Sequence, residues 1–269
     1  MQKCFWLELP VGIMKELVGE ISQILKSGGV ENFRQESVWI VEDAPDFETA
    51  RAYARRRAGG EPLQYILGTA PFRNLMLKVD RRVLIPRPET ESLVQWLIDR
   101  VPIGGSVLDL GCGSGAIAIA LADERRDLKI TAVDVSIEAL ALAKENAQLC
   151  NVDVEFMQSD LFSALSGKKF DFVAANLPYV TEKEYIALDP EVRDYEPKLA
   201  LTADDEGLAL ILKAIEVLPD HLNPGGGAIF ELSPHQAART AFALEKAGFT
   251  SAIVKDLCQR DRFVSGIIL

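Results

Sequence analysis

A strand, a glycine-rich turn and a helix follow one another between residues 107 and 122, and this succession constrains the fold more than any other feature of the chain. Residues 107–110 read VLDL, the turn at 111–115 reads GCGSG, and an alanine-rich helical stretch follows at 116–122. Such a turn lets backbone N–H groups approach a bound ligand closely. Because strands and helices continue to alternate after it, the sequence predicts an open α/β sheet.

An acidic residue after the next strand indicates what this turn binds. The expected strand at 129–133 ends in Asp134, whose carboxylate can accept hydrogen bonds from both hydroxyls of a ribose. The G-x-G-x-G spacing differs from the G-x-G-x-x-G pattern that supports a pyrophosphate, and Asp109 beside the turn suits a cationic group. With no hydride-transfer constellation in the chain, S-adenosylmethionine, which carries an ammonium and a sulfonium, is favoured over NAD.

Candidates for contact with an adenine follow the third strand. Ser136 is expected to cap a helix that runs through Gln148, and a strand at 152–157 then leads to Asp160. Asp160 can accept a hydrogen bond from the adenine amino group, with Leu161 or Phe162 against the ring, although a plain turn aspartate is the alternative. The predicted cofactor-binding residues are Asp109, Gly111, Cys112, Gly113, Ser114, Gly115, Asp134, Val135, Asp160, Leu161, Phe162 and Asn176.

The candidate catalytic residues are Asn176, Leu177, Pro178 and Tyr179, which follow a short apolar strand that begins at Phe170. The amide oxygen of Asn176 and the main-chain carbonyl of Leu177 can each accept one N–H of a planar NH2 group and so present its nitrogen to an electrophile. Tyr179 can stack on the same planar group. Ligands of open α/β sheets bind at such strand ends, but the tetrad by itself is equally compatible with a simple turn.

A helical domain is expected at residues 1–74, before a linker at 75–88 and the α/β domain at 89–269. Apolar residues recur at four-residue spacing, which predicts an amphipathic helix: Leu9, Ile13, Leu17, Ile21 and Leu25. A second helix is expected at 46–57. No catalytic constellation lies in this part, which suits recognition of a large partner. The arginines at 55–57 fit a contact for an acidic partner or, alternatively, a solvated helix end.

The expected linker contains a β-hairpin followed by a proline-stiffened segment. Residues 75–79 alternate in hydropathy, and residues 83–85 are apolar, which predicts two short strands around a turn at 80–82. Prolines at positions 86 and 88 then restrict the backbone before the next helix. The segment fits a wall of the active site as well as it fits a hinge.

Composition excludes several other functions. A net charge of -11 and a pI near 4.8 argue against a broad nucleic-acid surface. The cysteines Cys4, Cys112, Cys150 and Cys258 form no C-x-x-C pair, so reduced thiols are expected and no metal site. The sequence has no apolar run long enough for a bilayer and does not begin like a signal peptide, which predicts a cytoplasmic protein. We further expect no membrane partner, no direct nucleic-acid partner and a monomer.

The last third of the chain continues the alternation after a charged segment. Residues 181–206 carry prolines at 190 and 197 and are typical of a lid or a substrate loop. Helices are expected at 207–218 and 236–247, a strand at 228–232, and an antiparallel pair around 253 and 264–269. Glu231, at the end of an apolar strand, is a further candidate for the site.

Taken together, the motifs IPRPETE, LDLGCGSG, AVDVS, SDLF, NLPY and YEPKLAL make the chain resemble the HemK family, the peptide chain release factor glutamine N5-methyltransferases. The resemblance covers nearly the whole chain. It implies a class I S-adenosylmethionine-dependent methyltransferase fold, Rossmann-like and seven-stranded with an antiparallel last strand, joined by a β-hairpin to a small helical domain. It also implies methylation of the glutamine in the Gly-Gly-Gln motif of a release factor, which the helical domain would dock.

The resemblance implies a substrate site made of Asn176, Leu177, Pro178, Tyr179, Arg87 and Glu89. The chain departs from the family at Leu177, where Asn-Pro-Pro-Tyr is usual, and at 231–233, where Glu-Ile-Gly is expected. A backbone carbonyl serves at position 177, so the chemistry is expected to survive. Two alternatives remain: an adenine amino-methyltransferase acting on DNA or RNA, because the tetrad serves any planar NH2 group, and a non-catalytic, donor-binding adaptor.

Overall fold

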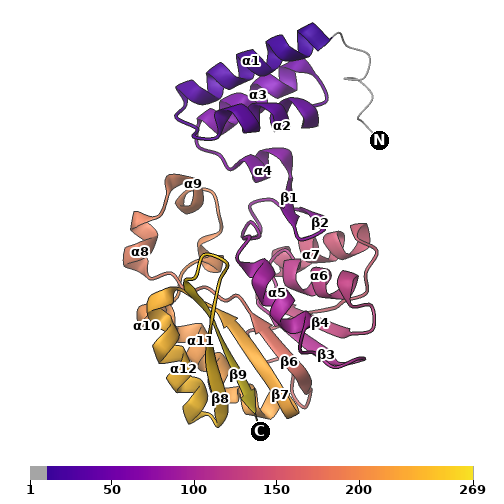
Figure 1. Ribbon diagram of the computed structural model, residues 1–269, viewed down its shortest axis with the longest axis vertical. Helices are drawn as coiled ribbons and strands as arrows, with labels where there is room; N and C mark the ends of the chain where they lie inside the picture. The colour runs from indigo at the N-terminus through magenta and orange to yellow at the C-terminus, as the bar shows by residue number, and fades with distance from the viewer. Residues whose placement is uncertain (1–10, 269) are drawn as a thin grey trace. The chain divides into compact units, whose positions relative to one another are not determined.

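The computed structural model describes residues 11–268, which form two compact units (Figure 1). The helical unit comprises the described residues up to Thr69 together with Asp189–Tyr195. The sheet unit comprises Ala70–Leu188 and the described residues from Glu196 onward. Two residues of the sequence analysis, Cys4 and Leu9, lie outside the described part of the chain.

The helical unit is built on α1 (Val11–Ser27), α2 (Phe33–Asp43), α3 (Phe47–Ala58), α4 (Leu63–Leu67) and the short α9 (Pro190–Arg193). The α1 stripe buries Leu17, Ile21 and Leu25, as its spacing predicts. Helix α2 was not predicted, because two of its four buried residues, Glu36 and Ser37, are polar and mask the apolar period.

The charged end of α3 is engaged within the helical unit. The guanidinium of Arg57 pairs with Glu36 at 2.6 Å and with Glu191 of α9 at 2.7 Å. Arg56 pairs with Glu61 at 2.8 Å. These two arginines therefore contribute to the unit itself, which argues against a contact with an acidic partner through either side chain.

The sheet unit has a seven-stranded sheet in the order β5-β4-β3-β6-β7-β9-β8. Its strands are β3 (Ser106–Leu110), β4 (Lys129–Asp134), β5 (Glu155–Gln158), β6 (Phe170–Ala175), β7 (Leu222–Glu231), β8 (Phe249–Lys255) and β9 (Asp261–Ile268). All neighbours are parallel except at β9, which is antiparallel to both β7 and β8. The predicted class I methyltransferase topology with an antiparallel last strand is confirmed.

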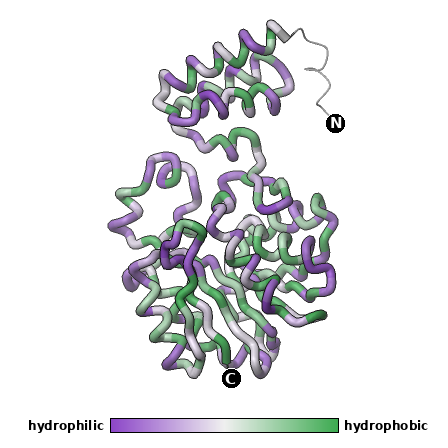
Figure 2. Tube along the Cα trace, viewed as in Figure 1, coloured by the Kyte–Doolittle hydropathy of each residue, from purple (hydrophilic) through white to green (hydrophobic). Residues whose placement is uncertain are grey.

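Helices cover both faces of this sheet because its central strands are apolar on both sides. Alternate residues of β6 enter different cores, Phe172 on one face and Val173 on the other. The first face is covered by α5 (Thr90–Ile98), α6 (Ala116–Glu124) and α7 (Ile137–Leu149), and the second by α11 (Ala209–Val217) and α12 (Ala237–Lys246). Figure 2 shows hydrophobic residues along the strands and hydrophilic residues in many of the connections.

The remaining helical elements of the sheet unit are short. They are α8 (Glu182–Ala187), α10 (Asp204–Gly207) and the 3-10 turns η2 (Lys198–Ala200), η3 (Leu218–His221) and η4 (Pro234–Gln236). Within residues 11–268, no helix combines the length and the apolar character that crossing a membrane requires.

The hairpin lies earlier in the chain than predicted. Its strands are β1 (Thr69–Phe72) and β2 (Leu75–Lys78), and the expected strand at 83–85 is absent. The reason is a long-range contact, since the backbone N–H of Ile85 donates to the buried carboxylate of Glu196 at 3.0 Å instead of to a neighbouring strand. The turn between β1 and β2 uses Arg73 at φ 50°.

Candidate functional site

Strand register brings the predicted cofactor and catalytic residues to one edge of the sheet. Leu110 at the end of β3 pairs with Val133 of β4 on one side and with Ala175 of β6 on the other. The glycine turn therefore lies between Asp134 and Asn176. The chain leaves β3 toward β4 and returns on its other side with β6, and such a reversal is where open α/β sheets bind ligands.

Asp109 lies fully buried beneath the glycine turn. Its Oδ2 accepts a hydrogen bond from the backbone N–H of Ala118 at 3.0 Å, whereas Oδ1 has no partner within residues 11–268. Burial raises the pKa of this carboxyl to about 7, and the Ala118 hydrogen bond opposes the shift. A buried acceptor without a partner fits the cationic group that the sequence analysis assigned to it.

Asp134 is held by the backbone of two turns. Its Oδ2 accepts from the N–H of Gly113 at 2.8 Å and its Oδ1 from the N–H of Ser136 at 2.9 Å. Burial nevertheless raises the pKa of Asp134 above its ordinary value. Each carboxylate oxygen keeps a second lone pair, so the residue can still accept hydrogen bonds from ribose hydroxyls.

The glycine turn and the catalytic tetrad touch each other through Gly111 and Leu177. A Cβ on Gly111, which has φ +78°, would lie 2.8 Å from Cδ2 of Leu177. The side chain of Leu177 is buried in this contact. Where the family usually has a proline, this chain therefore packs a leucine against the turn.

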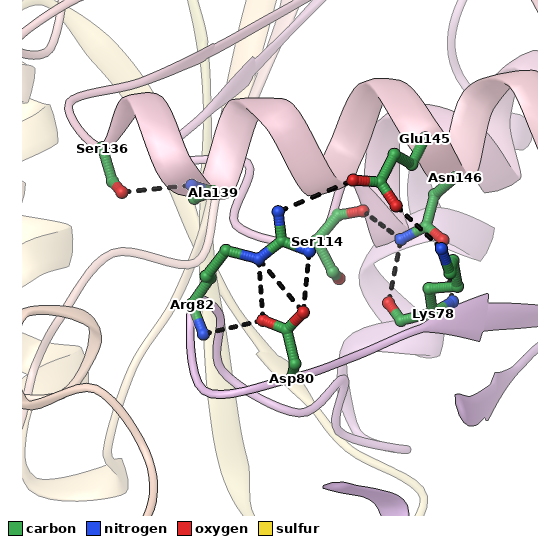
Figure 3. A network of polar contacts seen from close by, with 8 residues as sticks. All are labelled: Lys78, Asp80, Arg82, Ser114, Ser136, Ala139, Glu145 and Asn146. Carbon is green, nitrogen blue, oxygen red and sulfur yellow. Dashed lines mark hydrogen bonds and ion pairs between the residues drawn. The ribbon is translucent and has the colours of Figure 1, made fainter. Parts of the chain in front are cut away.

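Asn146, which was not among the predicted site residues, fixes the glycine turn from the side of α7. This fully buried residue of α7 accepts from the N–H of Lys78 at 2.7 Å and donates to the carbonyls of Lys78 and Ser114 at 3.0 Å each (Figure 3). It joins β2 to the glycine turn. An asparagine three residues after Ala143, on the buried face of the predicted helix, was the available signal.

Only some of the residues that were predicted to contact an adenine are exposed. Val135 is an apolar side chain 49% exposed beside Asp134, and the exposed Asp160 pairs with Lys213 at 3.2 Å. Phe162 is only 5% exposed and stacks on His221, with a distance of 4.6 Å between ring centroids. The Phe162 ring therefore packs in the core, and the contact of Leu161 or Phe162 with an adenine stays a prediction.

The remaining residues of the turn and tetrad lie beside those described. They are Cys112 and Gly115, both buried, and Pro178, which is half-buried, with the N–H of Gly115 donating to the carbonyl of Cys112 at 2.8 Å. Burial raises the pKa of the Cys112 thiol. Among the described residues, no group of three His, Cys, Asp or Glu side chains is arranged to hold a metal ion.

The tetrad is anchored at both ends. The Nδ2 of Asn176 donates to Oγ1 of Thr90 at 3.2 Å. The carbonyl of Tyr179 accepts from Nε2 of Gln236 at 2.8 Å, and its hydroxyl lies 3.5 Å from a nitrogen of Arg262. Burial raises the pKa of Tyr179 to about 12, so the phenol stays protonated at neutral pH.

The two predicted substrate residues outside the tetrad lie in ion pairs. Arg87 donates to Glu196 at 2.6 Å, and Glu89 accepts from Arg260 at 3.0 Å. Glu196, buried and also bonded to Ile85, thereby connects the IPRPETE and YEPKLAL motifs. The two motifs carry the resemblance, but their sequence alone does not predict this contact.

Replacing Gly207 by alanine should destabilise the protein. Gly207 has φ +80°, and a Cβ there would lie 2.0 Å from the Tyr179 carbonyl oxygen. We expect Gly207→Ala to lower the free energy of unfolding by about 3 kcal/mol, from backbone strain plus displacement of Tyr179. Gly167→Ala is the matched control, since Gly167 has φ +74° with nothing within 4 Å of a Cβ. Denaturant titration that gives equal losses for both variants would exclude the Tyr179 contact as a cause.

Comparison with solved structures supports the fold assignment. A methyltransferase from Pyrococcus furiosus superposes with a TM-score of 0.56 at 19% identity, over 71% of this chain and 87% of that one. At this level of identity the similarity shows a shared fold. In addition, the family model described as methyltransferase small domain matches residues 88–189.

Curated relatives extend the match to nearly the whole chain. A release factor glutamine methyltransferase from Geobacter sulfurreducens is 36% identical over 263 residues, which are 91% of this chain and 93% of the relative. One from Lactococcus lactis subsp. lactis is 40% identical over 216 residues, 79% of each chain. With such identity over this length, the resemblance seen in the motifs is confirmed, and the chain belongs to the release factor glutamine methyltransferase family.

Proposed function

We propose that this protein transfers a methyl group from S-adenosylmethionine to the side-chain amide nitrogen of the glutamine in the Gly-Gly-Gln motif of peptide chain release factors, and so modulates translation termination. The observation that carries the proposal is the position of Asn176. Its amide is anchored by Thr90 at the carboxyl end of β6, while the adjoining Leu177 touches the glycine turn. Family membership supports the same reaction and substrate.

Residues of the glycine-turn edge would hold the methyl donor. Asp109, with its unpartnered Oδ1, would pair with the ammonium, and Asp134 would accept from the ribose hydroxyls. Val135, Asp160 and the backbone at Leu161 would face the adenine. The donor supplies a methyl group on a sulfonium, which is already a strong electrophile.

The tetrad would orient the methyl acceptor. Oδ1 of Asn176 and the carbonyl of Leu177 each accept one N–H of the glutamine amide, and Tyr179 packs on its plane. These contacts direct the nitrogen lone pair at the methyl carbon. In a reactive geometry the nitrogen lies about 3–3.5 Å from that carbon. As the N–C bond forms, the C–S electron pair stays on sulfur, and the methylated nitrogen releases a proton to water. No general base is needed, so positioning supplies most of the rate.

The helical unit would dock the release factor, because it carries none of the predicted catalytic or cofactor-binding residues. A monomer is sufficient, because one chain contains both the docking unit and the catalytic unit. Since release factors act in the cytoplasm, the reaction would take place there. An acidic protein of this kind suits a protein substrate better than a nucleic acid.

Mass spectrometry of a recombinant release factor tests the proposal. The factor is incubated with the protein and S-adenosylmethionine, and any added methyl group is located by fragmentation. A methyl on the Gly-Gly-Gln glutamine supports the proposal. If the protein binds the donor but leaves the factor unmodified, transfer to adenine in DNA or RNA separates an amino-methyltransferase from a non-catalytic adaptor.

A further inference from the structure

Two buried side chains form a hydrogen-bonded chain behind Asn176. Oγ1 of Thr90 donates to Oε2 of Glu231 at 2.7 Å, and Nδ2 of Asn176 donates to Oγ1 of Thr90 at 3.2 Å. Thr90 is 4% exposed and Glu231 is 1% exposed, whereas Asn176 is half-buried. Only the asparagine therefore reaches the surface of the site.

The sheet and one helix together create this chain. Ala175 of β6 pairs with Phe230 of β7, so the next residues, Asn176 and Glu231, leave adjacent parallel strands at the same level. Thr90, the first residue of α5, bridges them. Side chains of α5 pack in one core with side chains of β3 and β6, which fixes Thr90 relative to the tetrad.

The chain has a direction that follows from its chemistry. A threonine hydroxyl has one proton, and an ionised carboxylate can only accept hydrogen bonds. Ionised Glu231 therefore accepts the hydrogen bond that the Thr90 hydroxyl donates, and the Thr90 oxygen is left to accept from the Asn176 amide nitrogen. This arrangement turns Nδ2 of Asn176 inward and leaves Oδ1 on the side away from Thr90. In the opposite orientation, the NH2 group of Asn176 would face the NH2 group of the methyl acceptor, and both groups are donors.

We propose that Thr90 and Glu231 are positioning residues, which fix the orientation of the Asn176 amide so that its oxygen faces the methyl acceptor. The inference rests on the proposed function, since it requires an acceptor that donates N–H groups. Neither residue touches the reacting atoms. Both act through Asn176.

The charged groups around Glu231 determine when it acts as an acceptor. Burial has the largest effect on Glu231 and raises its pKa to about 7. The hydrogen bond from Thr90 and the charges of Arg262 on β9 and Arg87 before α5 favour the ionised form, while Glu89 opposes it. The buried phenol of Tyr179 stays neutral. Below pH 7 a protonated Glu231 can donate to Thr90, which permits the reversed amide. The kcat of the wild type should then fall with acidity, and Glu231→Gln should lack that dependence.

Isosteric variants of Thr90 test the positioning role. Thr90→Val removes the hydroxyl and should lower kcat for glutamine methylation about tenfold, the factor expected for one hydrogen bond, with the KM for the donor unchanged. Thr90→Ser keeps the hydroxyl and should restore kcat. The matched control is Thr131→Val, because buried Thr131 also donates to a glutamate, Glu155, at 3.1 Å, but on β4 and β5. Its kcat should equal that of the wild type.

Proton exchange of the Asn176 side-chain amide provides a readout that does not depend on activity. Its NMR signal is assigned by its loss in Asn176→Ala, and its exchange with water should accelerate in Thr90→Val but not in Thr131→Val. Glu231→Gln serves as a second variant if Thr90→Val does not fold.

The combined outcomes separate the inference from the proposed function. Full activity in Thr90→Val, or an unchanged exchange rate, would overturn the positioning role. If the wild type leaves every release factor unmethylated while exchange still accelerates in Thr90→Val, the proposed function is wrong and the amide orientation stands. Lower kcat, rescue by serine and accelerated exchange together would support both.

Discussion

Asn176→Ala should lower kcat for glutamine methylation by about 10²–10³-fold, the effect expected when a preorganised polar group is removed from an active site. The variant loses the amide oxygen that orients the acceptor, whereas Asp109, the glycine turn and Asp134 stay in place. The dissociation constant for S-adenosylmethionine should therefore change little. Methyl incorporation followed by mass spectrometry and donor titration by calorimetry measure the two quantities separately.

An asparagine at the opposite end of the sheet provides the control for this prediction. Asn223, near the start of β7, donates to Asp171 at 2.8 Å. Asn223→Ala should leave both kcat and donor affinity unchanged. Parallel losses of turnover and donor binding in Asn176→Ala would contradict the role of Asn176 and would indicate that its loss disturbs the glycine turn through Leu177.

Asp109→Asn should stabilise the protein at neutral pH while weakening donor binding. The folded pKa of Asp109 is about 7, against an ordinary value of 3.8. Between these values the unfolded chain binds fewer protons at this residue than the folded protein does, so its contribution to stability falls as pH rises. Asparagine does not titrate. The unfolding free energy of the variant relative to the wild type should therefore increase by about 3 kcal/mol from pH 4 to pH 7, at up to about 1.4 kcal/mol per pH unit.

Denaturant titrations at several pH values, without added donor, measure this difference. Donor affinity at pH 8 should fall roughly 30-fold, because the amide cannot pair with an ammonium. Asp171→Asn is the contrasting variant. Burial raises the pKa of Asp171, but hydrogen bonds from Ser106 and Asn223 hold it below its ordinary value overall, so this variant should lose stability above pH 4. A pH-independent difference for Asp109→Asn would contradict the burial argument.

Local sequence determined the parts of the fold that depend on neighbouring residues. The glycine turn at 111–115, the Ser136 cap and the apolar strands were all predictable, because each depends on backbone conformation or on a period that the sequence displays. The cap, for example, is formed as predicted, with Oγ of Ser136 accepting from the N–H of Ala139 at 3.1 Å. The motifs also sufficed to indicate the family and the class I methyltransferase fold.

Tertiary structure decided the contacts between side chains that are remote in the chain. Thr90 and Glu231 are separated by 141 residues, and Ile85 and Glu196 by 111. No local pattern specifies such pairs. The same cause displaced the predicted hairpin, because the N–H of Ile85 found its acceptor in Glu196 rather than in a strand.

The candidate site depends on both the local sequence and the tertiary structure. The sequence by itself identified Asn176, Asp109 and Asp134, because each polar residue follows or interrupts an apolar strand. Only the sheet order placed them side by side. Packing against His221 placed the ring of Phe162 in the core, and helix α5 set Thr90 behind the Asn176 amide. The physical reason is that a side chain's orientation depends on the partners packed around it, and these partners come together only when strands and helices distant in the chain pack against one another.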